Sequence, residues 1–222
     1  MNRLNRLTKS SVVVLTALCI AATIAPTVTG QTGSSVSGQA IGISATTPAG
    51  SLIPAPLATL AAGGGMSNTE IAAVSVPGIL TAQDLAATTT GVVGENASSA
   101  QSLVSASNVN IFNGVISARQ LSVVASSASN GQQATSNGRS TLVGLVVNGI
   151  SMGDVSPVPN TTINVPSVGT IVLNEQVTTG GGITDRGVNV TMIHVILKNP
   201  LTGATMGDIA VGKASSYANF VR

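Results

Sequence analysis

The sequence predicts an all-β chain: a single β-sandwich-like domain of long strands, preceded by a cleavable signal helix. Three observations support this fold class. Runs rich in Val, Ile, Ser and Thr alternate apolar and polar residues with a period of two, which is typical of β-strands. Turn residues such as Gly, Asn and Pro interrupt these runs at short intervals. Amphipathic helical periodicity is nearly absent after residue 30.

Residues 1–30 have the pattern of a secretory signal peptide. Basic residues precede an apolar run over residues 11–25, and Pro26 then breaks that run. The run is shorter than the roughly 20 residues that a helix needs to span a bilayer. No second such run follows, so we expect no membrane span after cleavage. We place the cleavage after Gly30 and expect the mature chain to be secreted or held at the cell envelope.

Cleavage changes the charge of the chain. The precursor carries nine Lys and Arg residues against seven Asp and Glu residues. Removing Arg3, Arg6 and Lys9 leaves six bases against seven acids, and the mature net charge is therefore −1. No cationic stripe for phosphate groups remains, so a nucleic-acid partner is not expected. The sole cysteine, Cys19, leaves with the signal, so the fold must be stable without disulfides.

The mature chain, residues 31–222, is expected to be one extracellular all-β domain. Asn113-Gly114 and Asn148-Gly149 are favourable hairpin turns because both residue types tolerate positive φ. The segment 47–65 is expected to be a Pro/Gly-rich extended loop or edge segment, because proline cannot occupy a central strand. The expected strands are 36–45, 70–76, 80–88, 101–112, 115–126, 142–147, 170–177, 188–197 and 208–213.

An internal repeat bears on the architecture. The stretch 76–82 matches 112–118 in residue class at nearly every step, and Gly149 marks a fainter third copy. The three glycines concerned, Gly78, Gly114 and Gly149, are 36 and 35 residues apart. We expect a sandwich of successive long hairpins that turn at these glycines. A β-solenoid of stacked coils is the alternative.

The second half of the chain carries the motifs of a known family. They are Gly144-Leu-Val-Val-Asn-Gly149, Pro159-Asn-Thr-Thr-Ile-Asn-Val-Pro166 and Val188-Asn-Val-Thr-Met-Ile-His-Val-Ile-Leu197. In this order they resemble the closing half of the choice-of-anchor P family of exported bacterial proteins. Ala40-Ile-Gly-Ile-Ser44 and Val76-Pro-Gly-Ile-Leu80 also fall where that family places them. The resemblance implies a secreted or surface domain and carries no catalytic assignment.

Few residues can carry chemistry. His194 has apolar neighbours on both faces of its segment, so we expect a hydrogen-bonded core or half-buried histidine in a central strand. Glu175 is its candidate partner, although Asn174, Glu175 and Gln176 could instead hold a strand end, and Asp208 could approach the same region. These residues lie 19 and 14 positions apart, which is not a metal signature. Glu175, His194 and Asp208 are therefore candidates for a polar site, with no catalytic, metal or cofactor role assigned.

Three function classes are left open. The leading one is a nonenzymatic structural or adhesion-type protein, secreted or at the cell surface. Sparse charge and long Ser/Thr-rich strands suit contact with neutral polymers or with copies of the same chain. The first alternative is an extracellular module that binds carbohydrate or ice through flat Thr/Ser/Ala-rich strands. The second is a hydrolase-like enzyme that uses His194.

Scarcity of charge also predicts self-association. Unpaired strand edges need charges, prolines or bulges to prevent pairing between copies. The prolines of 47–65 can protect one edge, but no charged residue lies between Glu95 and Arg119. We therefore expect copies to associate, with the strand at 97–112 or its neighbour at the contact.

Overall fold

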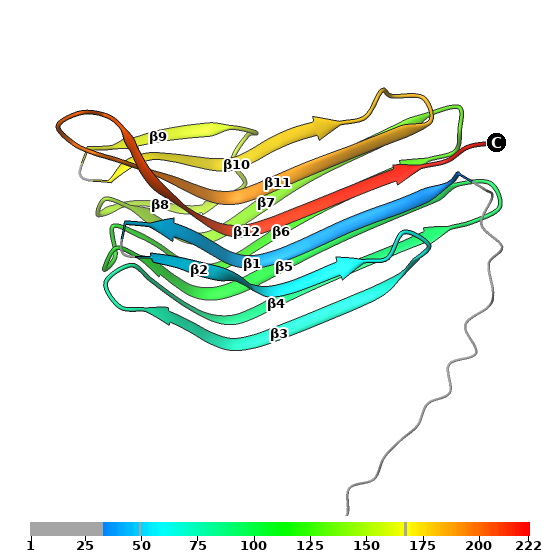
Figure 1. Cartoon of the computed structure of the whole chain (residues 1–222). Helices are drawn as coiled ribbons and strands as arrows, with labels where there is room; N and C mark the ends of the chain where they lie inside the picture. Colours follow the sequence, from blue (N-terminus) through cyan, green and yellow to red (C-terminus); the bar gives the residue numbers. More distant parts are fainter. Residues whose placement is uncertain (1–32, 49, 167) are drawn as a thin grey trace, which may run out of the picture.

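The computed structural model describes residues 33–48, 50–166 and 168–222, so the predicted signal peptide and its cleavage site lie outside the described residues. The described chain forms twelve strands in two antiparallel six-stranded sheets that face each other as a β-sandwich (Figure 1). Within these described ranges, no helix is long and apolar enough to span a membrane.

The two ends of the described chain form one sheet, sheet A, and its middle forms the other, sheet B. Sheet A contains β1 (Ser35–Thr47), β2 (Gly50–Leu60), β9 (Thr161–Val165), β10 (Gly169–Thr179), β11 (Asp185–Lys198) and β12 (Thr205–Asn219). Sheet B contains β3 (Gly64–Val76), β4 (Leu80–Val93), β5 (Ser98–Ile111), β6 (Ile116–Ser129), β7 (Ala134–Val147) and β8 (Ile150–Val155). The spatial order is β2-β1-β12-β11-β10-β9 in sheet A and β3-β4-β5-β6-β7-β8 in sheet B. Sheet B is thus a meander, whereas sheet A pairs the first strand with the last.

The structure confirms the sandwich and overturns the solenoid alternative, because the repeated segments lie in successive hairpins of one antiparallel meander. Gly78, Gly114 and Gly149 lie in the turns of the β3–β4, β5–β6 and β7–β8 hairpins, with φ of 73°, 97° and 76°. One period of the repeat is therefore one pair of antiparallel strands. The nine predicted strands are all present, and most extend beyond their predicted bounds.

The expectation for 47–65 is confirmed in part: the segment is extended and lies at a sheet edge, but it is not a loop, because most of it is strand. Gly50–Leu60 form β2 and pair with β1, and Gly64 and Gly65 already belong to β3. β2 is an edge strand of sheet A, where a proline costs no ladder hydrogen bond if its ring faces the open side. The sequence pattern also does not indicate β8 and β9, because they are only six and five residues long.

The four sheet edges are β2, β3, β8 and β9. The strand expected at 97–112 is β5, which pairs with β4 on one side and β6 on the other. Both neighbours are interior strands as well. The predicted contact between copies through an unpaired edge at this position is therefore wrong, because its backbone groups are already bonded within the sheet. Self-association itself stays a prediction.

A line of backbone irregularities crosses both sheets near the middle of the long strands, and we call this line the crease. The strands bend there in both sheets (Figure 1). The ladder of paired residues is interrupted along it in each sheet. Its residues in the left-handed region, with φ from 47° to 66°, are Asp84, Asn108, Gly144, Asn174 and Gly212.

The crease shifts the alternation of side chains between the two faces of each sheet. In sheet A two successive residues face the core, at Gly42–Ile43, Leu173–Asn174, Met192–Ile193 and Val211–Gly212. In sheet B two successive residues face outward, at Gln83–Asp84, Ser107–Asn108, Arg119–Gln120 and Val143–Gly144. An extra residue lengthens the face on which it lies and bends the strand away from it. The inner face of sheet A is therefore convex at the crease and nests into sheet B, and the outer face of sheet A is concave.

The crease separates two wings whose cores differ in side-chain size. One wing, the large-residue wing, is filled by side chains such as Ile111, Ile116, Leu145, Ile171 and Ile209. The other, the small-residue wing, buries mainly Ala, Ser, Thr and Val. Hydroxyl groups connect the sheets in this wing: Ser127 Oγ donates to Ser216 O at 3.1 Å, and Ser98 Oγ donates to Asn219 O at 2.9 Å. These bonds satisfy polar groups that would be costly to bury unpaired.

Asn174 connects the two sheets at the crease. Its side chain is almost fully buried, and its Nδ2 donates to Pro157 O at 2.7 Å. Its Oδ1 accepts a hydrogen bond from Ser140 Oγ of β7 at 3.0 Å and another from Gln176 Nε2 at 2.9 Å. Asparagine also tolerates the left-handed backbone that this position requires, with φ of 52°. One residue thus supplies both the backbone geometry and the polar partners.

Replacing Asn174 should separate these two contributions. Asn174→Gly keeps the left-handed backbone and loses the hydrogen bonds, and we expect a cost of about 1–3 kcal/mol for the unpaired buried groups. Asn174→Ala adds roughly 1–2 kcal/mol of backbone strain. Free energies of unfolding from urea titrations check the order. An alanine variant as stable as the glycine variant would show that the backbone conformation does not matter here.

Candidate functional site

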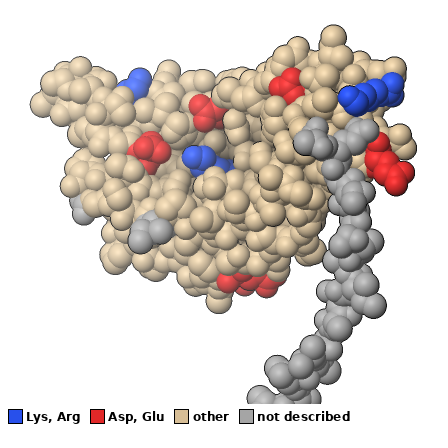
Figure 2. Space-filling model, turned by 45° about the vertical axis from the view of Figure 1, so that its right-hand side comes forward, with Lys and Arg blue, Asp and Glu red and all other residues tan. Residues whose placement is uncertain are grey.

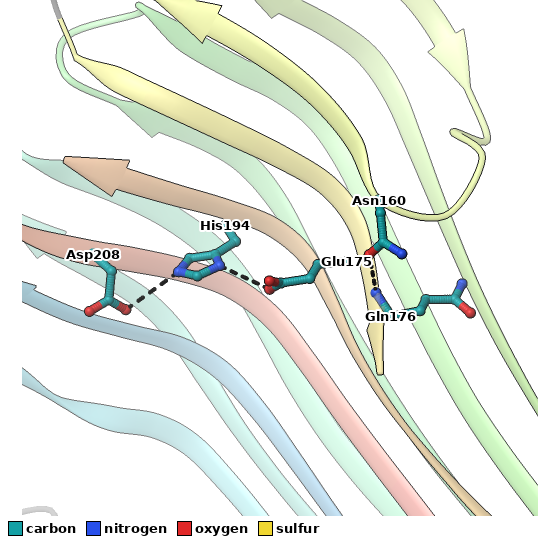
Figure 3. Close-up of polar contacts among 5 residues, drawn as sticks. All are labelled: Asn160, Glu175, Gln176, His194 and Asp208. Atoms are coloured by element: carbon teal, nitrogen blue, oxygen red, sulfur yellow. Dashed lines mark hydrogen bonds and ion pairs between the residues drawn. The ribbon is translucent and has the colours of Figure 1, made fainter. Parts of the chain in front are cut away.

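The three predicted site residues lie together on the outer face of sheet A. They come from three neighbouring strands, with His194 on β11 between Glu175 on β10 and Asp208 on β12 (Figure 3). His194 Nδ1 is 2.9 Å from Glu175 Oε2, and His194 Nε2 is 3.9 Å from Asp208 Oδ2. The side chain of His194 is 23% exposed, and that of Asp208 is 50% exposed. The expectation of a hydrogen-bonded, half-buried histidine in a central strand is confirmed.

The concave side of the crease explains the contact between Glu175 and His194. In the ladder Glu175 is paired with Thr191, three residues before His194. Met192 and Ile193 both face the core, so Thr191 and His194 follow each other directly on the outer face. The hydrogen bond between Glu175 and His194 therefore spans the crease and connects the two wings of sheet A.

Asn174 and Gln176 do bond to the backbone, as the alternative interpretation proposed, but they lie in the middle of strand β10 and not at its end. Gln176 Nε2 donates to Gly138 O of sheet B at 2.9 Å. The backbone N–H of Gln176 donates to Asn160 Oδ1 at 2.9 Å (Figure 3). Glu175 takes no part in this network, because its side chain points to the opposite face of the sheet.

The chemistry available at His194 is limited by its two carboxylate neighbours. The distance of 3.9 Å to Asp208 is too long for a hydrogen bond. Within the described ranges, the one side-chain hydrogen bond of the ring is that between Nδ1 and Glu175. The described residues also contain no group of three His, Cys, Asp or Glu side chains arranged to hold a metal ion. The arrangement is that of a polar clamp across the crease.

A second polar contact lies farther along the same face. The hydroxyl of Tyr217 donates to Asp185 Oδ2 at 3.0 Å. The ring lies beside Gly187, where an added Cβ would be 3.0 Å from Tyr217 Cδ2. Burial raises the pKa of Tyr217 above its ordinary value, and the hydrogen bond and negative charge of Asp185 raise it further. The neutral phenol is therefore favoured in the folded protein.

The outer face of sheet B in the small-residue wing has a different character. On β4 to β7 it presents mostly hydroxyl and amide side chains, interspersed with aliphatic ones such as Val92, Leu103 and Val124, and its one charged side chain is that of Arg139. Figure 2 shows how sparse the charged side chains are on one view of the surface. The Thr/Ser/Ala-rich strands expected for a carbohydrate- or ice-binding module contribute to this face, and the strand order decides which of their residues share it. The outward polar residues are Thr88, Thr90, Ser99, Gln101, Ser105, Ser122, Ser126, Thr135, Asn137 and Thr141.

If the clamp is structural, replacing His194 should reduce stability. His194→Ala removes the hydrogen-bond partner of Glu175, and we expect a loss of about 1 kcal/mol. Glu175→Gln keeps a hydrogen-bond acceptor for the ring and should cost less. Urea titrations at pH 7 measure both. Unchanged stability of His194→Ala would rule out the clamp.

The raised pKa of Tyr217 predicts a loss of stability in alkali. The unfolded chain ionises its tyrosine at about pH 10. The stability that the neutral phenol contributes is therefore present below about pH 10 and is lost as the pH rises through the higher pKa of the folded state. Tyr217→Phe should show a shallower decline above pH 10 in urea titrations. Parallel declines of both proteins would contradict this assignment.

Comparison with known proteins adds no identification: no family model matches the chain, and the searches of curated proteins and of solved structures give no significant match. The resemblance to the choice-of-anchor P family stays a prediction.

Proposed function

We propose that this chain is an exported, nonenzymatic structural or adhesion-type protein that acts in the extracellular medium or at the cell surface. The observation that supports the proposal is the outer face of sheet B. Four adjacent long strands, β4 to β7, present a broad face on which hydroxyl and amide groups predominate and charge is almost absent. Such a face suits contact with uncharged, hydroxylated polymers.

The interior of the molecule is consistent with a structural role for the folded domain. Both sheets are continuous, and hydroxyl groups of Ser98 and Ser127 tie them together. The contact between His194 and Glu175 connects the two wings of sheet A across the crease, and we assign it a structural role. The signal-peptide pattern of residues 1–30 supplies the route of export.

Fractionation of cells that express the full chain tests the proposal. We expect the protein in the medium or the envelope fraction, with an intact mass that corresponds to a chain beginning at Gln31. Export is directed by the apolar run, so a variant with Leu15→Arg should stay in the cytoplasm at full length. Recovery of the unaltered chain solely from the cytoplasm, with residues 1–30 still attached, would overturn the proposal.

A further inference from the structure

Three adjoining hollows on the outer face of sheet B form one continuous trough. The first has a volume of about 1020 Å³ and begins beside the glycines at 63–65. It shares Gln101, Ser126 and Asn137 with the second hollow, of about 350 Å³. The second shares Ser122 and Thr141 with the third, of about 470 Å³, which ends at the crease beside Asp84. We call this surface the trough.

The trough follows the strands. On β5 its lining runs from Ser99 to Ser107, which corresponds to roughly 27 Å at about 3.3 Å per residue. Its floor is formed by β5 and β6, two neighbouring strands that pair on both sides of the crease (Figure 1). A long open trough suits an extended chain better than a compact small molecule.

Rows of polar side chains cross the trough. Ladder pairing places Thr90, Gln101, Ser126 and Asn137 side by side on four adjacent strands. In the described part of the chain, the side-chain amides of Gln101 and Asn137 have no hydrogen-bond partner within the protein. Each amide can both donate and accept. Four residues farther along the strands, a second row contains Ser105, Ser122 and Thr141.

The charge of the trough narrows the class of ligand. The first hollow has no charged residue in its lining, and the other two have one each, Arg139 and Asp84. A polyanion would need several cationic side chains along its path. A protein partner would need a central apolar and aromatic contact. The outward aliphatic side chains of the lining are scattered and do not form such a centre: Val92 lies at one end of the trough, Val124 lies between the two polar rows, and Val143 lies at the crease.

We propose that the trough binds an extended, uncharged polysaccharide chain, an inference that deepens the proposed function and rests on it. The hydroxyl groups of a neutral glycan pair with the free amides of Gln101 and Asn137 and with the neighbouring Ser and Thr hydroxyls. Val92 and Val124 provide aliphatic surface for the apolar faces of the sugar rings. Because no aromatic side chain lies in the trough, hydrogen bonds carry most of the specificity.

The opposite face of the molecule offers a matched control. On the outer face of sheet A, Thr59, Gln39, Ser215 and Asn189 lie side by side on four adjacent strands. This row has the same residue types in the same order as the row of the trough. Its hollow is smaller, about 280 Å³, and includes Lys213. A row of this composition outside the trough is thus available for comparison.

Affinity electrophoresis of the purified protein tests the proposal, with native gels that contain mixed-linkage β-glucan, galactomannan or dextran, and alginate as the polyanion. Sedimentation with cellulose and chitin extends the test to insoluble glycans. We expect at least one neutral polysaccharide to retard or capture the protein. The double variant Gln101→Ala, Asn137→Ala should bind about tenfold more weakly, as expected for the loss of one or two hydrogen bonds. The variant Gln39→Ala, Asn189→Ala should bind within about twofold of the unaltered protein.

A further variant, Ser105→Lys, places a long side chain in the trough without altering the row at Gln101 and should also weaken binding. Circular dichroism and thermal midpoints verify that each variant is folded. Failure of all five neutral polysaccharides to bind, preference for alginate, or equal weakening by the sheet A control would each overturn the proposal. Because this test uses purified protein, its failure leaves the fractionation result for export unaffected, and the reverse also holds.

Discussion

The two sheets can pack along strands of up to 15 residues because they bend at the same line. Strands of this length are well above the usual five or six residues, and such sheets twist strongly unless something interrupts them. At the crease, the extra residues lie on the inner face of sheet A and on the outer face of sheet B. Both sheets therefore bend in the same direction, and sheet A nests into sheet B. If only one sheet carried the irregularities, the layers would separate on one side of the bend. The crease is therefore a property of the pair of sheets.

Several of the charged groups lie at the crease. On sheet A, the contact between Glu175 and His194 spans it. On sheet B, Arg119 lies 3.6 Å from Asp154, whose carboxylate accepts the N–H of Gly144 at 2.8 Å. Outward-pointing carboxylates can satisfy a bent backbone in this way, whereas regular strands satisfy their own. With few charged residues in the chain, their use at the crease leaves the outer face of the small-residue wing nearly neutral, and this is the face on which the proposed function depends.

The period-two alternation was sufficient to predict the long strands, and the Asn-Gly dipeptides predicted two of the hairpin turns. It was not sufficient to predict the crease, because one extra residue moves every later side chain to the other face. This explains why the segment around His194 looks apolar on both faces in the sequence. Met192 ends one run of alternating residues and Ile193 begins the next, so both side chains face the core. Asn174 inside a strand was the available signal, since asparagine is uncommon there and tolerates positive φ.

The polar cluster could be anticipated from three residue types in neighbouring strands, but the trough could not. Its rows combine residues from β4 to β7 that are up to 47 positions apart, between Thr90 and Asn137, and only the strand order brings them together.

The strand order also decides which edge strands can pair with a second copy of the chain. Prolines lie on β2, β9 has five residues, and β8 has six residues and carries Asp154. β3, by contrast, is 13 residues long with Glu70 as its one charge. Pairing between copies through an edge would therefore use β3, which leaves the trough on the adjoining face open to a ligand.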